Sequence, residues 1–275
     1  MLTCVQQQEG SWRVRQAAVR PCVYLDHWAL DQVGSDSELA ATLIAALQAS
    51  GGTLCISVVN AAEACKASDP KHARRIDTFL AAAMPQIAMV DLGAMAISEG
   101  IPDTAEGEIP VYALGDPPLE RQLAFEFAMI VSKPNGIGWV ESAWLQRERR
   151  GDILSTVSAN IATRWDEERQ KEAWRDRART APLNRPAKRA WRVIADVMRP
   201  AVINTAQSIP VNDGADCLHA LVLPYCDFVL LEHKWADRAE STRRRFEKHG
   251  EKIGKTISQR TGGVAKLVEE LLAFG

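Results

Sequence analysis

The chain has 275 residues, of which 47% are hydrophobic and 25% are charged, and its formal net charge is −2. These values are typical of a folded globular protein, and they exclude disordered and fibrous classes. The small net charge gives no global sign of a nucleic-acid partner. No apolar run is long enough to span a bilayer, and the first residues lack the pattern of a signal peptide. We therefore expect no membrane partner and a cytoplasmic location.

Short apolar runs alternate with helical segments in the first third of the chain. Residues 4–20 are expected to form an edge strand or an arm that leads into the first buried strand. Strands are predicted at 22–26, 53–58 and 86–91, and helices at 37–49, 60–66 and 69–83. Ser35 or Ser37 is the expected cap of the first helix. The order strand, helix, strand, helices, strand is typical of a parallel α/β sheet.

The middle of the chain is predicted to be helical. After an irregular connection at 93–115, helices are expected at 119–131, 138–149, 152–179 and 186–198. Basic residues outnumber acidic ones between Arg147 and Pro200, so this inserted block is locally basic. The α/β pattern then resumes, with a helix at 213–223, a strand at 227–231 and helices at 243–249 and 264–274.

The expected fold is α/β, with a parallel sheet of about four to five strands flanked by helices. We expect one domain across 1–275, formed by 20–92 and 208–275, with a helical block inserted at about 116–200.

Carboxylates recur at strand ends or in the helices beside them. Asp26 closes the first strand, Glu63 lies in the helix after the second, and Asp213 and Asp216 open the helix before the last strand. Taken singly, such acids are more often helix caps or turn residues. Several acids in one cleft repel each other unless a cation neutralises them, and hard oxygen ligands suit Mg²⁺ or Mn²⁺. Their joint placement therefore favours a metal site.

Three stretches carry a resemblance to a known family: Val23-Tyr24-Leu25-Asp26, the segment from Ile56 to Glu63, and the segment from Asp213 to Leu231. They resemble successive motifs of PIN-domain ribonucleases and occur in that family's order, over roughly the first ninety and the last seventy residues. The resemblance implies a PIN-like parallel sheet and a nuclease that hydrolyses phosphodiester bonds with Mg or Mn. It also implies that Asp26, Glu63 and Asp216 are catalytic metal ligands, with Asp213 assisting.

The chain departs from that pattern after the last predicted strand. Where the family usually has Thr or Ser followed by Asp, this chain reads Leu231-Glu232-His233. His233 stands in the place of the acid, so Glu232 or Asp237 supplies a fourth acid or the fourth acid is missing. His233 itself is either a proton donor or phosphate contact, or a surface residue.

Basic and aromatic residues are candidates for contacts with RNA, single-stranded or structured. The candidate phosphate contacts are Arg243, Arg244, Arg245, Arg177, Lys188 and Arg189. Trp165, Trp174 and Trp191 are candidates for stacking on unpaired bases. The alternative is that the charges form solvated helix faces with internal ion pairs and that the tryptophans pack in the core.

Three functions remain open. The first is a metal-dependent endoribonuclease, and the second is a catalytically degenerate PIN-like domain that binds RNA or a protein partner without cleaving. The third is a helical interaction protein whose acids are only caps. The family includes both toxins paired with protein regulators and RNA-processing enzymes, and nothing in the sequence distinguishes these or excludes a homodimer.

Overall fold

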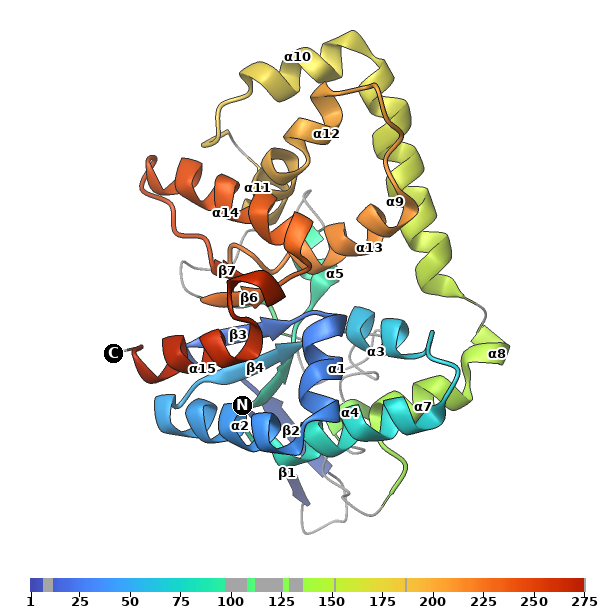
Figure 1. Ribbon diagram of the computed structural model, residues 1–275, viewed down its shortest axis with the longest axis vertical. Coiled ribbons are helices and arrows are strands. Elements are labelled where there is room, and N and C mark those ends of the chain that lie inside the picture. Colours follow the sequence, from blue (N-terminus) through green and yellow to red (C-terminus); the bar gives the residue numbers. More distant parts are fainter. Residues whose placement is uncertain are drawn as a thin grey trace.

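The computed structural model describes residues 1–6, 12–96, 108–111, 126–128, 136–150, 152–185 and 187–274. Its centre is a five-stranded sheet in the order β5-β4-β3-β6-β7, in which every neighbouring pair is parallel (Figure 1). The strands are β3 (Cys22–Leu25), β4 (Thr53–Ile56), β5 (Ile87–Met89), β6 (Phe228–Leu230) and β7 (Lys255–Ile257). The predicted α/β class and parallel sheet are therefore confirmed.

The strand order changes direction at the centre of the sheet. From β3 the chain builds outward through β4 to β5, and it later returns to the other side of β3 to add β6 and then β7. The register places Tyr24 of β3 beside Val229 of β6. In open α/β sheets, ligands bind beyond the carboxyl ends of the strands at the point where the order reverses, which here lies between β3 and β6.

Alternate side chains of each strand pack on opposite faces of the sheet. Val23 and Leu25 of β3 belong to one apolar core, whereas Cys22 and Tyr24 belong to the other. All four are buried, as expected for a strand covered by helices on both sides.

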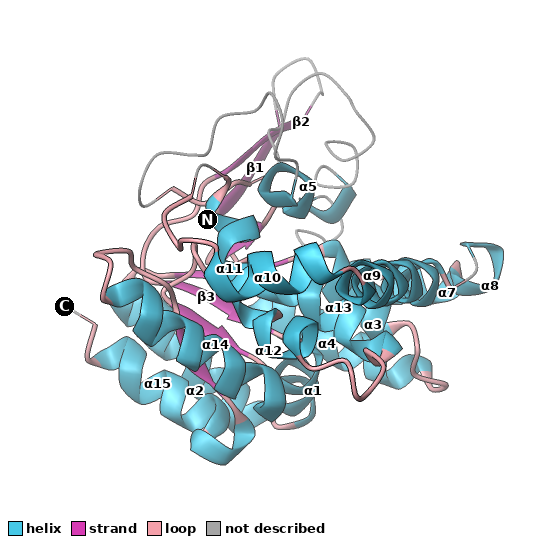
Figure 2. Ribbon diagram, turned by 90° about the horizontal axis from the view of Figure 1, so that it is seen from above, coloured by secondary structure: helices cyan, strands magenta, loops and turns pink. Residues whose placement is uncertain are grey.

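The helices form two layers around the sheet (Figure 2). The first core contains residues of α1 (His27–Ser35), α2 (Ser37–Ser50), α4 (Pro70–Ala82) and α15 (Gly263–Leu272). The second contains residues of α9 (Ile153–Gln170), α11 (Arg189–Val197), α13 (Val211–Ala220) and α14 (His233–Glu247). The other helices whose bounds lie within the described residues are α3 (Val58–Ala64), α5 (Leu92–Ala96), α7 (Trp139–Leu145), α8 (Arg147–Arg150), α10 (Glu172–Thr180), α12 (Arg199–Ile203) and the 3₁₀ helix η1 (Gln259–Thr261).

The inserted helices share a core with the sheet. Val193 and Ile194 of α11 and Val202 of α12 are buried in the same cluster as Tyr24 and Val229. The block therefore covers one face of the sheet in addition to extending beyond it, with α10 at its far end (Figure 1).

Local sequence explains where several helices begin and end. Asp36 caps α2, because its carboxylate accepts hydrogen bonds from the backbone of Glu38 (3.1 Å) and Leu39 (3.0 Å), so the predicted serine caps are wrong. Gly51 ends α2 in the left-handed conformation with φ of 66°. Asp69 caps α4 as predicted, accepting from Lys71 N at 2.9 Å.

Other elements differ from their predictions. The helix predicted over 152–179 is divided at Lys171, whose backbone is extended (φ −76°, ψ 124°). Helix α14 starts ten residues before the predicted basic helix, and α1 and β7 have no predicted counterpart. The N-terminal stretch contains an antiparallel pair, β1 (Leu2–Gln6) and β2 (Trp12–Gln16), in a sheet of its own. Most of the predicted connection at 93–115 and helix at 119–131 lies outside the described residues.

Among the helices in the described part of the chain, none combines the length and the apolar character that a transmembrane span requires.

Candidate acidic site at the carboxyl edge of the sheet

Asp26 lies where β3 ends and α1 begins. Its backbone N–H donates to Leu230 O of β6 (3.2 Å), and its carboxylate accepts from Ala29 N (3.4 Å) as the cap of α1. The residue is only 5% exposed. Asp26 is thus fixed at the carboxyl end of β3, as predicted from the sequence, and this end lies at the point where the strand order reverses.

A buried amide connects this strand end to the helix that carries Glu63. Asn60 donates from Nδ2 to Leu25 O (2.9 Å), and its Oδ1 accepts from the backbone of Ser57 (2.8 Å). Asn60 is 3% exposed, so both bonds form away from water. The amide therefore fixes the start of α3 relative to the end of β3.

Glu63 takes part in a chain of buried hydrogen bonds. His219 Nε2 lies 2.8 Å from Glu63 Oε2, and its Nδ1 lies 2.7 Å from the hydroxyl of Tyr24. The Tyr24 hydroxyl is in turn 2.8 Å from Ser57 Oγ. Burial alone would lower the pKa of His219, but the carboxylates of Glu63, Asp26 and Asp216 outweigh it and raise that pKa. A protonated His219 donates from both ring nitrogens, so Tyr24 accepts from it and donates to Ser57.

Two acids beside this series of hydrogen bonds have strongly raised pKa values. Burial raises the pKa of Asp26 to about 7 and that of Asp216 to about 7, and in each case His219 partly offsets the effect while the charge of Glu63 adds to it. Burial also opposes the ionisation of Glu63, but His219 outweighs it and holds the pKa of Glu63 below its usual range. Asp26, Glu63 and Asp216 are therefore close enough to form one electrostatic unit.

This unit lacks a matching basic charge. Neither Asp26 nor Asp216 forms an ion pair with any lysine or arginine in the described parts of the chain, and the buried His219 is the cation that both acids sense most strongly. The three acids carry more negative charge than one imidazolium can balance.

Asp213 is engaged by basic residues of the neighbouring helix. It is 4% exposed and lies 3.1 Å from Lys234 Nζ and 3.3 Å from an Arg238 nitrogen, with Trp235 Nε1 at 3.4 Å. These partners all belong to α14, so Asp213 ties α13 to α14 and is already neutralised. These contacts favour a structural ion pair over the assisting ligand that we expected.

The three candidates for the predicted fourth position of the metal site, Glu232, His233 and Asp237, lie at the start of α14. Glu232 precedes the helix and is exposed, and its charge contributes to the raised pKa of Asp216. His233 contacts Arg260, and its Nε2 lies 3.5 Å from the exposed carboxylate of Asp237. Glu232 is therefore the acid of this segment that acts on the site, whereas His233 and Asp237 pair with each other.

Most predicted phosphate contacts on α14 are engaged with acids. Arg243 binds Glu240 (2.6 Å) and also contacts Glu247, and Arg245 lies 2.9 Å from the buried carboxylate of Asp196. Arg244 is the most exposed of the three arginines and lies 3.4 Å from Glu240. Arg243, Arg244 and Arg245 therefore largely follow the alternative interpretation, in which the charges form ion pairs along and between helices.

The candidates in the inserted block fall into two groups. Lys188 is 6% exposed and donates to Ala94 O, which favours a structural contact over the predicted phosphate contact. Arg189 stacks its guanidinium 4.9 Å from the ring centre of Tyr225. Arg177 is exposed on α10 and forms no ion pair with a described residue.

The predicted metal ligands are brought to one edge but are not drawn together into a closed metal site. In the described residues, no group of three or more His, Cys, Asp or Glu side chains is arranged to hold a metal ion. The chemistry of the set nevertheless suits a hard cation, because the buried Asp26 and the partly buried Asp216 form no ion pair with a described lysine or arginine and the other oxygen of Glu63 bonds to no described residue.

Sequence reasoning missed four residues of the site: Tyr24, Ser57, Asn60 and His219. One signal was present for His219, because Asp216 and His219 are three residues apart and so share a face of α13. The others depend on contacts between distant segments.

Fold and geometry thus define a doubly wound α/β protein with a buried acidic site at the reversal point of its sheet. Comparison of the chain with protein-family models, curated proteins and solved structures found no match.

Proposed function

We propose that this protein is a PIN-like, metal-dependent nuclease that hydrolyses phosphodiester bonds, with RNA as its substrate. The observation that carries the proposal is the excess of negative charge that the buried Asp26 and the partly buried Glu63 and Asp216 place at the carboxyl edge of the sheet. Buried acids with raised pKa values and no basic partner destabilise a fold, so their presence favours a functional role.

Asp26 and Asp216 would hold a Mg²⁺ or Mn²⁺ ion together with the second oxygen of Glu63. Such an ion supplies a positive charge that makes a bound water more acidic and offsets the charge on a phosphate. His219 keeps the Glu63 carboxylate oriented through its 2.8 Å contact, and Tyr24 fixes the imidazole from the other side. Glu232, at the start of α14, is the acid best placed to add to the set.

Cleavage of a single-stranded RNA by the full chain tests the proposal. We expect activity with Mn²⁺ or Mg²⁺, none in EDTA, and a loss of at least about a hundredfold in Asp26→Asn or Asp216→Asn, since each change removes a charged ligand. Asp227→Asn is the matched control, because Asp227 is paired with Arg20 at the amino end of β6, on the opposite edge of the sheet. Activity that survives in Asp26→Asn, or that is lost equally in Asp227→Asn, would refute the assignment.

A catalytically degenerate domain is the second candidate. It is favoured by His233, which stands where an acid is expected and pairs with Asp237, and by the dispersed arrangement of the acids. On this reading RNA binds equally well with Mn²⁺ and with EDTA, and no cleavage occurs in either condition. A filter-binding assay run beside the cleavage assay separates the two candidates.

A further inference from the structure

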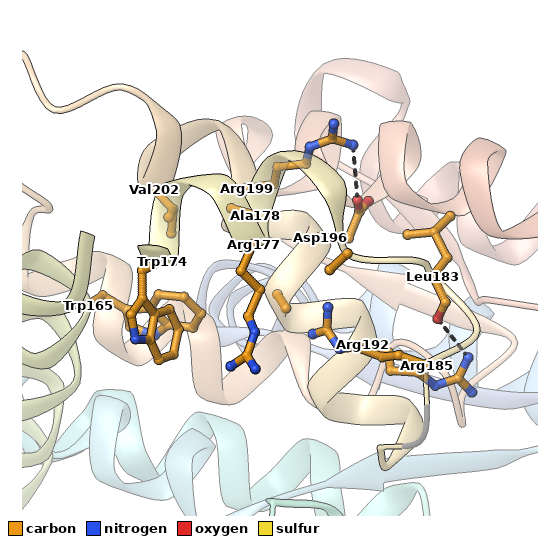
Figure 3. A pocket seen from close by; sticks show the side chains of 12 residues that line it. Trp165, Trp174, Arg177, Ala178, Leu183, Arg185, Arg192, Asp196, Arg199 and Val202 are labelled. Atoms are coloured by element: carbon orange, nitrogen blue, oxygen red, sulfur yellow. Dashed lines mark hydrogen bonds and ion pairs between the residues drawn. The ribbon is translucent and has the colours of Figure 1, made fainter. Parts of the chain in front are cut away.

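A cavity lies in the inserted block, among α9, α10 and α11. It has a volume of about 660 Å³ and is lined by Trp165, Trp174, Trp191, Arg164, Arg177 and Arg185, among others. A smaller hollow of about 60 Å³ adjoins it and shares Trp165, Trp174, Arg177 and Arg185 (Figure 3). A pocket of this size is within the range that holds a small organic ligand.

The aromatic walls are only partly covered by the protein. Trp165 and Trp174 meet edge to face, with ring centres 6.3 Å apart and an angle of 84° between their planes. Both are half-buried, and Trp191 is 37% exposed. Because three indoles from three helices border the cavity, a flat aromatic group entering it finds a π-face to stack on.

The charge in this cavity is positive and unbalanced. Neither Arg164, Arg177 nor Arg185 forms an ion pair with any other residue that the structure describes. The arginines beside them differ, because Arg192 contacts Glu251 and Arg199 is paired with Asp196. Figure 3 shows Arg177 extending into the space between the tryptophans and Arg185. Burial and the neighbouring charges of Arg177 and Arg192 lower the pKa of Arg185, as expected of a cationic cluster that lacks an anion.

Stacking surfaces beside free guanidinium groups fit a ligand that has both a flat ring and a negative charge. Guanidinium groups bind phosphate through paired N–H donors, and indoles stack on any base. Glu168 is the acidic residue that lines the cavity, and its Oε2 lies 2.9 Å from Lys171 Nζ, which neutralises it. We propose that this cavity is a nucleotide-binding site, in which the base stacks on Trp165 and Trp174 and the phosphate binds Arg177 and Arg185.

The proposal goes beyond the acidic site and does not depend on it, since no carboxylate of that site lines the cavity. The ligand is either a free nucleotide or one nucleotide of an RNA strand. Both sources offer the same base and phosphate.

Calorimetric titration of the full chain with AMP, in EDTA, tests the assignment. We expect one AMP to bind, and adenosine and inorganic phosphate to bind at least about tenfold more weakly, because each lacks one of the two recognised groups. Arg177→Gln should weaken AMP binding by about tenfold or more. Arg179→Gln is the matched control, because it removes the same charge from the same helix at a residue that pairs with Asp176 and does not line the cavity. Its affinity for AMP should change by less than about twofold.

Trp174→Leu should also weaken AMP binding, and circular dichroism checks that each variant is folded. A single-stranded RNA pentamer that binds about tenfold more tightly than AMP indicates an RNA strand as the source, whereas equal or weaker binding indicates a free nucleotide. The proposal is wrong if AMP does not bind, or if Arg177→Gln and Arg179→Gln bind AMP alike. It is also wrong if phosphate or an acidic peptide binds as tightly as AMP. Because the titration contains EDTA, its outcome is separate from that of the cleavage assay.

Discussion

Asp26 and Asp213 show that two buried aspartates of one protein have opposite roles. Both are at most 5% exposed. Asp213 is surrounded by Lys234, Trp235 and Arg238, whereas Asp26 faces other acids and has a pKa of about 7. The first contributes to stability as an ion pair, and the second reduces it whenever it is ionised.

Replacing Asp26 by Asn should stabilise the protein without metal. The folded-state pKa of about 7 lies above the usual value of 3.8, so the cost of ionising Asp26 is absent below about pH 4 and grows until about pH 7. Asp26→Asn should therefore be increasingly more stable than wild type across this window, by on the order of 2–4 kcal/mol at pH 8. Asn also retains the capping role. Urea unfolding in EDTA at pH 5 and pH 8 measures the difference, and a variant that is less stable at pH 8 would contradict the account.

Asp213→Asn should have the opposite effect. It leaves Lys234 and Arg238 beside a neutral partner, which should destabilise the fold by about 2–4 kcal/mol at pH 7. Because Asp213 is structural, metal-dependent cleavage should persist at temperatures where the variant is folded. Paired unfolding and cleavage measurements check this, and loss of activity in a fully folded variant would restore Asp213 as a ligand.

The buried contacts explain why some site residues could not be predicted. Asp26 and Glu63 follow strands or lie in the next helix, so the period of the sequence indicates their position. His219 is 195 residues from Tyr24 in sequence and 156 from Glu63, and no local pattern predicts such contacts. The same holds for Asp213, because only the packing of α14 reveals its basic partners.

At the scale of elements, helix α13, which carries Asp216 and His219, is held by a close contact with α9. Helix α13 packs against α9 at Gly214, where an added Cβ would lie 2.1 Å from Ser158 O. Two backbones can approach this closely only because the residue has no side chain. Gly214 therefore sets the position of the helix face from which Asp216 and His219 reach the site.

Gly214→Ala should separate the two helices and destabilise the protein by about 1–3 kcal/mol. It should also lower metal-dependent cleavage, because the site residues of α13 would shift with the helix. Asn212→Ala, an exposed change two residues earlier on α13, is the control and should alter neither property. If thermal unfolding shows Gly214→Ala to be as stable as wild type, the backbone contact with α9 is not as close as described.

Elements were predictable where their signals are local. The continuous apolar run of β3 and the Asp69-Pro70 start of α4 are both present in the sequence. The division of the long helix at Lys171 was not predicted, because its neighbours have high helix propensity and tertiary packing of α10 against α12 overrides it. Strand β7 has only three residues, of which Lys255 is exposed, so it lacks the apolar run of a buried strand.

At the scale of the whole molecule, metal binding and stability should be linked. An ion that binds the folded state alone stabilises it by about 2.7 kcal/mol at a free concentration near 100 times its dissociation constant. We expect Mn²⁺ to raise the melting temperature of wild type, and to do so more at pH 8 than at pH 5.5, because Asp26 and Asp216 must be ionised to bind it.

In Asp26→Asn the stabilisation by Mn²⁺ should be largely lost. The variant is expected to be more stable than wild type in EDTA and to gain little from Mn²⁺, whereas Asp227→Asn should gain as much as wild type. Differential scanning calorimetry of the three proteins, with and without Mn²⁺, measures each change. An equal gain in wild type and Asp26→Asn would mean that the ion binds elsewhere.

The central claim is that Asp26, Glu63 and Asp216 together form a divalent-metal site. The most direct measurement is the anomalous scattering of manganese in crystals of the full chain grown with MnCl₂ at pH 8. We predict a peak bounded by these three carboxylates, at about 2.0–2.3 Å from their nearest oxygens, and its absence in Asp26→Asn crystals. If wild-type crystals saturated with Mn²⁺ show no peak there, the acids do not form a metal site and the proposed nuclease mechanism is wrong.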